Sequence, residues 1–169
     1  MGAAPHGHRS GGEKGRKEVK TTPKTSGTSR AETVLQEYRE ALIRSDGLIA
    51  QHEALGALKD PGSGQLVRMK ELEEILIPEA IAKEQRLKAE ANALLDLPGG
   101  SLAALSRQVL ELRYLCAFEW ETVNETVFGG MCDFAQKPTK YSDRMFKWHR
   151  KGLDAIGAAL DRKMRSPAE

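Results

Sequence analysis

The sequence has few aromatic residues and almost no cysteine. Aromatic residues make up 5% of its 169 residues, whereas charged residues make up 30% and hydrophobic residues 40%. A β-sandwich needs many aromatic and β-branched side chains, whereas this balance is typical of amphipathic helices. The composition therefore predicts an all-α protein with one modest core.

The sequence also lacks long apolar segments. No run of eighteen apolar residues occurs, and the first residues are polar and basic. A membrane-spanning helix needs about 20 apolar residues, and a secretory signal needs an apolar region of about 7 to 15. We therefore expect no membrane partner and a cytoplasmic location.

The residue patterns of common catalytic and metal sites are missing as well. Cys116 and Cys132 lie sixteen positions apart, with no CxxC motif and no histidine pair at ligand spacing, so we expect no metal and no cofactor. The P-loop, GxSxG and HExxH motifs do not occur, so we expect no enzymatic activity. In a reducing compartment, Cys116 is expected to be a small buried core residue.

The positive charges that the sequence does contain gather in two segments. Residues 1–30 hold seven Lys and Arg against two Glu, and residues 136–165 hold nine Lys and Arg against three Asp. Because the formal net charge of the whole chain is only +2, the segment between them is strongly acidic. This asymmetry indicates a polyanionic partner that contacts the basic segments.

The first of these segments, residues 1–30, contains almost nothing large and apolar. It is rich in Gly, Ser, Thr, Lys and Pro, so burial cannot offset the entropy that ordering would cost. We expect a disordered basic arm. Its charge either adds phosphate attraction or is simply solvated.

Residues 31–97 carry two helical patterns. Apolar residues recur at helical spacing over 31–59, as one long helix or two pieces, and again over 66–97. The stretch DPGSG at 60–64 separates the two patterns, and Pro78 is expected to kink or restart the second. The expected product is a helical hairpin or coiled-coil arm, which either packs against the rest of the chain or mediates self-association as a homo-oligomer.

Residues 101–165 predict three further helices after the break LPGG. Ser101 is expected to cap the first, over 102–118, whose buried face includes Cys116. The second covers 119–128 and stops at Gly129 and Gly130. The third begins at Ser142, and its expected inner residues are Met145, Phe146, His149, Leu153, Ile156 and Leu160.

A buried helix, a short helix that opens with Glu and Trp, and a basic amphipathic helix follow one another in the order of a helix-turn-helix. In that motif the last helix enters the major groove of DNA. Arg113 and Glu121 are candidates for an ion pair between the first two helices.

The segments LELRYLCAFEWETVNE and MFKWHRKGLDAI resemble sigma factor region 4, and more closely the sigma-region-4-like regulators of phages and prophages related to the ArpU group. The similarity covers about residues 105–156. It implies a helix-turn-helix bundle, a sequence-specific DNA-binding transcription regulator in the nucleoid of a bacterial cell, and RNA polymerase as a candidate second partner. The matching residues, in order, are Leu112, Arg113, Tyr114, Trp120, Glu121, His149 and Leu153.

One feature departs from that pattern. The family joins its second and third helices by a tight turn, whereas GGMCDFAQKPTKY inserts about ten more residues here. The insertion either widens the helix pair or lays Lys137, Lys140 and Tyr141 beside a phosphate, and it leaves the docking geometry open.

The resemblance implies that the start of the third helix reads double-stranded DNA. Arg bridges the O6 and N7 atoms of guanine, whereas Lys acts mainly as a point charge toward phosphate. The alternative is a solvated basic face. The candidate DNA-binding residues are Lys140, Tyr141, Ser142, Asp143, Arg144, Lys147, Arg150 and Lys151.

Two other functions fit the same segments. A DNA-packaging small terminase subunit also joins a helix-turn-helix to helical oligomerisation segments, and ring assembly would distinguish it. A helical adaptor without a nucleic-acid partner would bind regardless of charge reversal on the last helix. A regulator that dimerises through residues 31–97 would read two half-sites.

Overall fold

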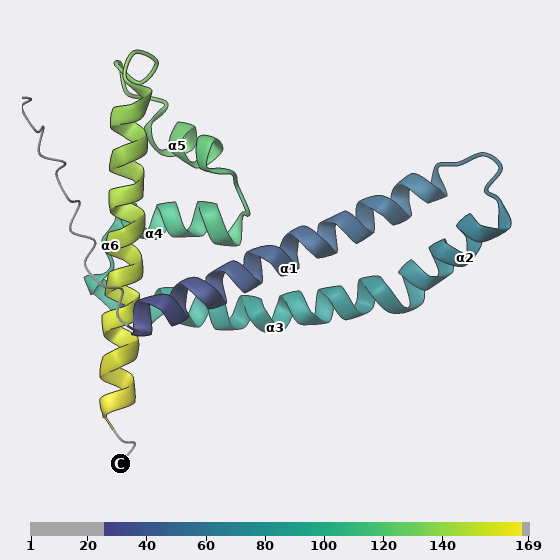
Figure 1. Cartoon of the computed structure of the whole chain (residues 1–169), viewed down its shortest axis with the longest axis horizontal. Helices are drawn as coiled ribbons and strands as arrows, with labels where there is room; N and C mark the ends of the chain where they lie inside the picture. Colours follow the sequence, from purple (N-terminus) through teal and green to yellow (C-terminus); the bar gives the residue numbers. More distant parts are fainter. Residues whose placement is uncertain (1–25, 167–169) are drawn as a thin grey trace, which may run out of the picture.

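The computed structural model describes residues 26–166, and over that range the chain is helical with no strand (Figure 1). This confirms the predicted all-α class. None of the helices in this range is both long and apolar enough to cross a lipid bilayer. The elements in chain order are α1 (Ser26–Gly56), α2 (Ser63–Glu71), a π-helical turn (Leu72–Leu76), α3 (Ile77–Asp96), a 3-10 turn (Gly99–Ser101), α4 (Ala104–Leu110), a second π-helical turn (Glu111–Leu115), α5 (Trp120–Phe128) and α6 (Pro138–Arg165).

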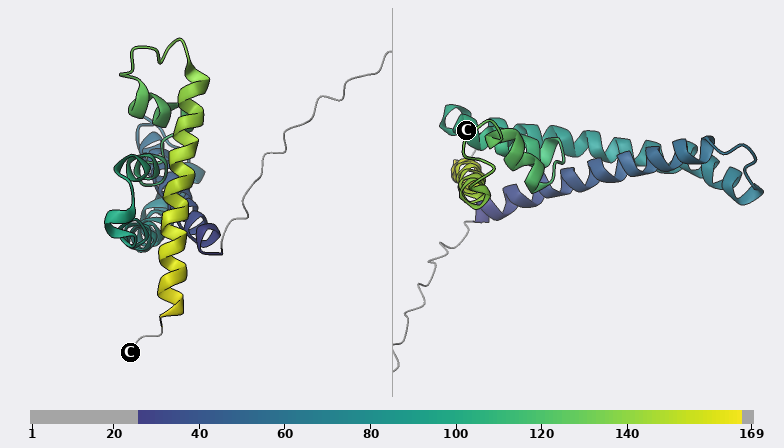
Figure 2. Two further views of the ribbon diagram at one scale, coloured as in Figure 1. Left: turned by 90° about the vertical axis from the view of Figure 1, so that its left-hand side faces the viewer. Right: turned by 90° about the horizontal axis from the view of Figure 1, so that it is seen from above.

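The molecule consists of a long arm set across a long helix. α1 and α3 lie side by side and form the arm with α2 at its tip, and the arm projects from the C-terminal half of α6 (Figures 1 and 2). α4 and α5 pack on the N-terminal half of α6, on the same side as the arm (Figure 1).

The first helix is longer than the sequence predicted. Residues 26–30 were expected to be disordered but form the first turn of α1, in which Gly27 and Thr28 are buried. They are ordered because they pack against α6, a contact between distant parts of the chain. Gly47 does not interrupt the helix. The rest of the predicted disordered arm, residues 1–25, lies outside the described residues.

The second helical pattern of the arm, predicted over residues 66–97, forms a continuous bent helix made of α2, the π-helical turn and α3. The amide of Ile77 donates to the carbonyl of Leu72, which closes a π-helical turn directly before Pro78. Proline has no amide hydrogen and crowds the preceding turn, and a wider turn accommodates it without a break. Pro78 was expected to kink or restart the helix, and in the structure the helix changes from the π form to the α form just before it.

One core is shared by three parts of the molecule. These are the inner half of the arm, α6, and the end of α4 with the π-helical turn that follows it. This means that the turn at 97–101 does not separate two independent cores. The buried members of the shared core are Ala31, Leu35, Tyr38, Ala41, Leu87, Ala91, Leu95, Leu110, Tyr114, Leu153 and Ile156.

Two glycines allow α1 and α6 to cross closely. A Cβ on Gly157 would lie 2.8 Å from the Cα of Thr28, and a Cβ on Gly27 would overlap the carbonyl oxygen of Gly157. Figure 1 shows the start of α1 lying across α6 at this level. The absence of side chains at both positions is what brings the two backbones together.

A second core lies between α4, α5 and the N-terminal half of α6. Its buried residues are Val109, Val123, Phe128, Tyr141 and Met145. Ser106 of α4 also donates to the carbonyl oxygen of Trp148 at 2.8 Å, which ties α4 to α6. α6 is thereby held by two cores, one at each half.

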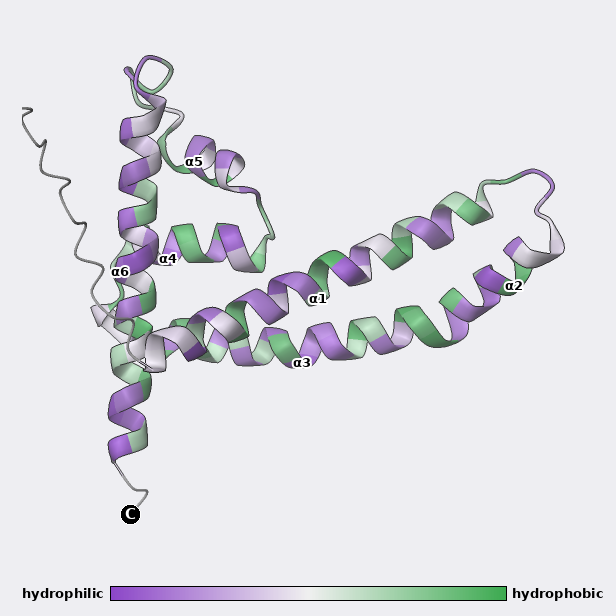
Figure 3. Ribbon diagram, in the orientation of Figure 1, coloured by the Kyte–Doolittle hydropathy of each residue, from purple (hydrophilic) through white to green (hydrophobic). Residues whose placement is uncertain are grey.

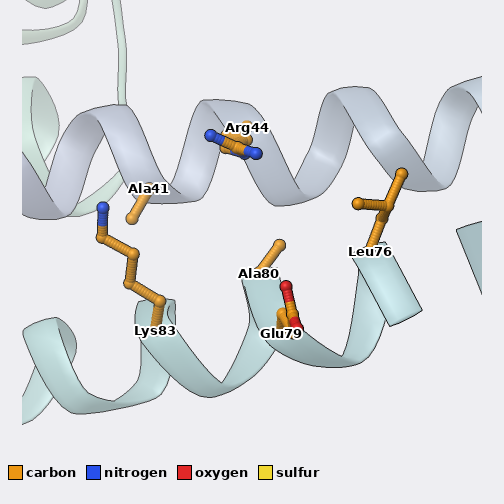
Figure 4. A pocket seen from close by; sticks show the side chains of 6 residues that line it. All are labelled: Ala41, Arg44, Leu76, Glu79, Ala80 and Lys83. Carbon is orange, nitrogen blue, oxygen red and sulfur yellow. The ribbon is translucent and has the colours of Figure 1, made fainter.

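The outer part of the arm is thinly packed. No residue between 46 and 71 is buried. A small hollow lies between α1 and α3, where Ala41 and Ala80 are too short to fill the space and Arg44 and Lys83 lie at the rim (Figure 4). Leu72 is the outermost buried residue of the arm. Beyond it, several apolar residues stay exposed although the ribbon is partly hydrophobic (Figure 3).

Two expectations about the start of the C-terminal segment were wrong. Ser101 does not cap α4; its hydroxyl donates to the carbonyl of Pro98, and α4 begins at Ala104. Cys116 is exposed, because the π-helical turn shifts the register just before it and Ala117 ends the helix in the left-handed conformation at φ 55°.

Candidate nucleic-acid interface

The candidate interface is carried by the first half of α6. This helix begins at Pro138, earlier than the predicted start at Ser142. Proline is favoured in a first helical turn because its fixed φ suits the helix and its missing amide hydrogen has no partner there anyway. The extra turn brings Lys140 and Tyr141 into the helix.

The buried face of this half-helix was predicted well except at one residue. Met145, Leu153 and Ile156 are buried, as expected, but the side chain of Phe146 is 43% exposed. With about 100° per residue, Phe146 lies roughly 80° away from Ile156 around the helix. A helical projection alone would not have shown that Phe146 is exposed, because Leu153 lies only about 20° from it around the helix and is buried.

The opposite face presents a basic stripe, which we define as Lys140, Arg144, Lys147 and Lys151. Their spacing of four, three and four residues places them on one face of a helix, and all four are exposed. Arg150 is exposed beside the stripe, on the same flank as Asp143. The stripe therefore combines four of the five cationic residues predicted for DNA binding on one surface, and Arg150 lies next to it.

The loop before α6 occupies one end of the stripe. Asp133 pairs with Lys140 at 3.0 Å and with Lys137 at 3.4 Å, and it accepts a hydrogen bond from the Tyr141 hydroxyl. The bonds from Tyr141 and Lys140 hold the pKa of the Asp133 carboxyl well below its usual range, and Asp133 in turn raises the pKa of Lys140. Lys140 is thus partly neutralised within the protein.

Tyr141 and Ser142 do not belong to the exposed face. Tyr141 is 3% exposed, and its ring packs against Phe128 and Phe134. Ser142 is half-buried and its hydroxyl accepts a hydrogen bond from Asn124 of α5 at 3.3 Å. The sequence pattern placed them beside DNA because it did not show that the loop and α5 cover this side of α6.

The remaining cations stay free to contact a ligand. In the described part of the chain, Arg144, Lys147, Arg150 and Lys151 form no ion pair within 4 Å. Arg144 lies over the ring of Phe128 at 5.4 Å and Lys151 over the ring of Trp148 at 4.7 Å. Such cation–π contacts orient the side chains and leave their charges unneutralised.

An aromatic cluster holds the start of α5 against α6. The ring of Trp120 lies 5.0 Å from Phe146 and 4.9 Å from His149, and the Arg113 guanidinium lies 4.5 Å above it. His149 also shares a hydrogen bond of 3.0 Å with the hydroxyl of Tyr114. Burial raises the pKa of that hydroxyl to about 12, so Tyr114 remains neutral at any physiological pH.

A second network ties the arm to the start of α5. The buried Arg39 of α1 contacts Glu119 at 2.5 Å, and Arg113 contacts the other carboxylate oxygen of Glu119 at 3.2 Å. The hydrogen bond from Arg113 and the charge of Arg39 lower the pKa of Glu119. The ion pair expected between Arg113 and Glu121 is therefore wrong, because Glu119 lies between the two arginines.

The chain matches no protein family, no curated protein and no solved structure.

Proposed function

We propose that this protein is a sequence-specific transcription regulator that binds double-stranded DNA with the first half of α6 in the major groove. The basic stripe carries this proposal. Three of its four cations, Arg144, Lys147 and Lys151, have no ion-pair partner among residues 26–166 and project from a helix whose other face is packed. A charge arrangement of this kind suits the phosphate backbone of a duplex.

The surroundings of α6 suit entry into a groove. The major groove is about 12 Å wide and admits one helix. α4 and α5 pack on the inner face of α6, and among the stripe residues Arg144 lies over the ring of Phe128 at the end of α5. α4, α5 and α6 follow one another in the order of a helix-turn-helix, which supports the resemblance to sigma-region-4-like phage and prophage regulators. That resemblance makes RNA polymerase a proposed second partner and the bacterial nucleoid the proposed location.

The arm has a proposed role in self-association. Its outer part leaves large apolar side chains uncovered, among them Leu66 and Val67, and a second copy would remove them from water. A dimer formed through the arm would place two α6 helices on two half-sites.

A DNA-packaging small terminase subunit is the second candidate. The same exposed apolar residues on the arm favour it, because a packaging subunit assembles through helical segments outside its DNA-binding unit. A closed ring in solution would support this candidate, whereas a dimer would support the regulator.

The experiment that tests DNA binding is a fluorescence-anisotropy titration of random duplex DNA at two salt concentrations. We expect wild-type affinity to fall steeply with salt, because each neutralised phosphate releases counterions. The double variant Arg144→Ala/Lys147→Ala should bind at least about tenfold more weakly at low salt and show a shallower salt dependence.

A matched control removes two positive charges from the arm instead. Arg86 and Lys88 are exposed on α3 and form no ion pair among the described residues, so Arg86→Ala/Lys88→Ala should bind like wild type. Equal weakening by both double variants would show a nonspecific charge effect. If wild type fails to bind any duplex at low salt, DNA recognition is wrong and a helical adaptor becomes the better interpretation.

A further inference from the structure

Phe146 is an exposed aromatic residue on α6, although large apolar residues close to it on the same helix are buried. Its side chain is 43% exposed, whereas Met145 is 1% exposed and Leu153 is 3% exposed. It lies beside the basic stripe in a shallow hollow on α6. The residues that line this hollow are Asp143, Phe146, Lys147, Arg150, Lys151 and Asp154.

The exposed ring is held in place from one side. Trp120, at the start of α5, lies 5.0 Å from it with the two ring planes at 60°. Trp120 is itself fixed between His149 and the Arg113 guanidinium. One edge of Phe146 is therefore packed, and the other is presented at the surface in a fixed orientation.

The spacing of the neighbouring residues is that of a base-reading face. Asp143, Phe146, Lys147 and Arg150 follow one another at i, i+3, i+4 and i+7, and recognition helices in the major groove contact base edges from positions with this spacing. Arg144 and Lys151 lie on the other flank of the stripe. α6 thus offers one flank for base edges and one for phosphates.

The chemistry of this flank selects particular bases. The C5-methyl group of thymine is the apolar feature of the major groove, and an aromatic side chain can contact it. Arg150, which is exposed and has no ion pair in the described range, can bridge the O6 and N7 atoms of guanine. Four residues of helix advance about 6 Å, which is roughly two base-pair steps.

We propose that Phe146 reads the methyl group of a thymine and that Arg150 reads a guanine within two base pairs of it. This inference rests on the proposed DNA-binding function and assigns its sequence preference. A partner protein could also cover an exposed aromatic ring, but the hollow around Phe146 holds three cations against the two carboxylates of Asp143 and Asp154, and this balance favours a polyanion.

The test begins with a duplex selected by the wild-type protein from a randomised pool. Each thymine in the selected site is then replaced by deoxyuridine, which lacks the methyl group but keeps the base pairing. One such replacement should weaken wild-type binding about 3- to 10-fold. Phe146→Ala should bind the thymine duplex about as weakly and should not distinguish thymine from uracil.

Two further measurements keep the test independent of folding. Replacing guanine by 7-deazaguanine removes the N7 acceptor, so it should weaken wild type several-fold but not Arg150→Ala, whose side chain lies at the surface. Phe118→Ala removes another exposed aromatic residue, and this control should retain the thymine preference.

The outcomes separate the inference from the function on which it rests. If wild type binds duplex DNA but neither uracil nor 7-deazaguanine changes its affinity, the base assignment is overturned and DNA binding stands. The same conclusion follows if Phe146→Ala and Arg150→Ala still respond to these replacements as wild type does. If wild type binds no duplex at low salt, the proposed function itself fails.

Discussion

At the scale of single residues, Asp133 decides which part of α6 is available to a ligand. It lies in the loop between α5 and α6, where it binds Lys137, Lys140 and Tyr141 at once. These contacts fold the long loop back onto the first turn of α6. The loop therefore anchors the start of the helix, and Asp133 partly neutralises the charge of Lys140.

Replacing Asp133 with Asn should lower stability in a pH-dependent way. The pKa of Asp133 is lower in the folded protein than in the unfolded chain, where it is about 4. The charged carboxylate therefore stabilises the fold fully at pH values above the unfolded-state pKa. This stabilisation is lost as the pH falls from there toward the folded-state pKa. We expect a lower melting temperature than wild type at pH 7 and a difference that narrows between about pH 4 and pH 2. Thermal unfolding followed by circular dichroism measures both.

Asp143→Asn is the matched control for this measurement. Asp143 is exposed on α6 and forms no ion pair within the described range, so its replacement should leave the melting temperature nearly unchanged. A difference between Asp133→Asn and wild type that is constant from pH 7 to pH 2 would contradict an electrostatic role for Asp133.

At the scale of elements, the crossing of α1 and α6 depends on two residues without side chains. Gly27 and Gly157 meet where the helices touch, and Thr28 packs directly on Gly157. Helices with larger residues at the contact stay 8–10 Å apart. The close approach seats the start of the arm firmly on α6, so the arm and the proposed DNA-binding helix are mechanically joined.

Gly157→Ala should destabilise the protein although alanine favours helix. The added Cβ would lie 2.8 Å from the Cα of Thr28, and overpacking of this kind costs about 1–3 kcal/mol. The helix propensity of alanine returns only about 1 kcal/mol. We expect a net loss of up to about 2 kcal/mol in urea unfolding.

Gly47→Ala in α1 should have the opposite sign. No atom lies within 4 Å of a Cβ at this exposed position, so the substitution should stabilise the protein by about 0.5–1 kcal/mol. Similar effects at Gly47 and Gly157 would mean that the helix crossing is not as close as described.

At the scale of the whole molecule, the outer part of the arm extends beyond the hydrophobic core that packs its inner part. Its inner half is packed against α6, whereas residues 46–71 include no buried side chain. Val67 is 70% exposed, and Leu58, Leu66 and Ile75 are also exposed. We propose that these exposed apolar residues form the surface through which two copies associate.

The double variant Leu66→Glu/Val67→Glu should abolish self-association without unfolding the protein. Both side chains are exposed, so their loss costs the single chain little, but two charges at the contact would oppose the approach of a second copy. Sedimentation velocity should show an oligomer for wild type and a monomer for the variant. Gln65→Glu adds a charge on the same helix without removing an apolar group, so this control should weaken association less than the double variant. If wild type is a monomer, the proposed self-association through the arm is wrong.

Much of the helical architecture could be predicted from the sequence. Helical periodicity predicted α1, α5 and most of α6, and Gly129 was recognised as the end of α5. These features depend on residues three or four positions apart, so the local sequence encodes them. The cations of the basic stripe could be named for the same reason.

Only the tertiary structure decided which side of each helix is covered. Tyr141 became buried because the loop returns to it, Phe146 stayed exposed because α5 covers only one of its edges, and Glu119 became an ion-pair partner because α1 brings Arg39 to it. The ordering of residues 26–30 likewise depends on α6, more than a hundred positions away. The sequence by itself determined the helices and their charged faces, because these follow from local spacing. Which part of such a face is covered depends on the other segments that pack against it. The local pattern of the helix itself does not contain this information.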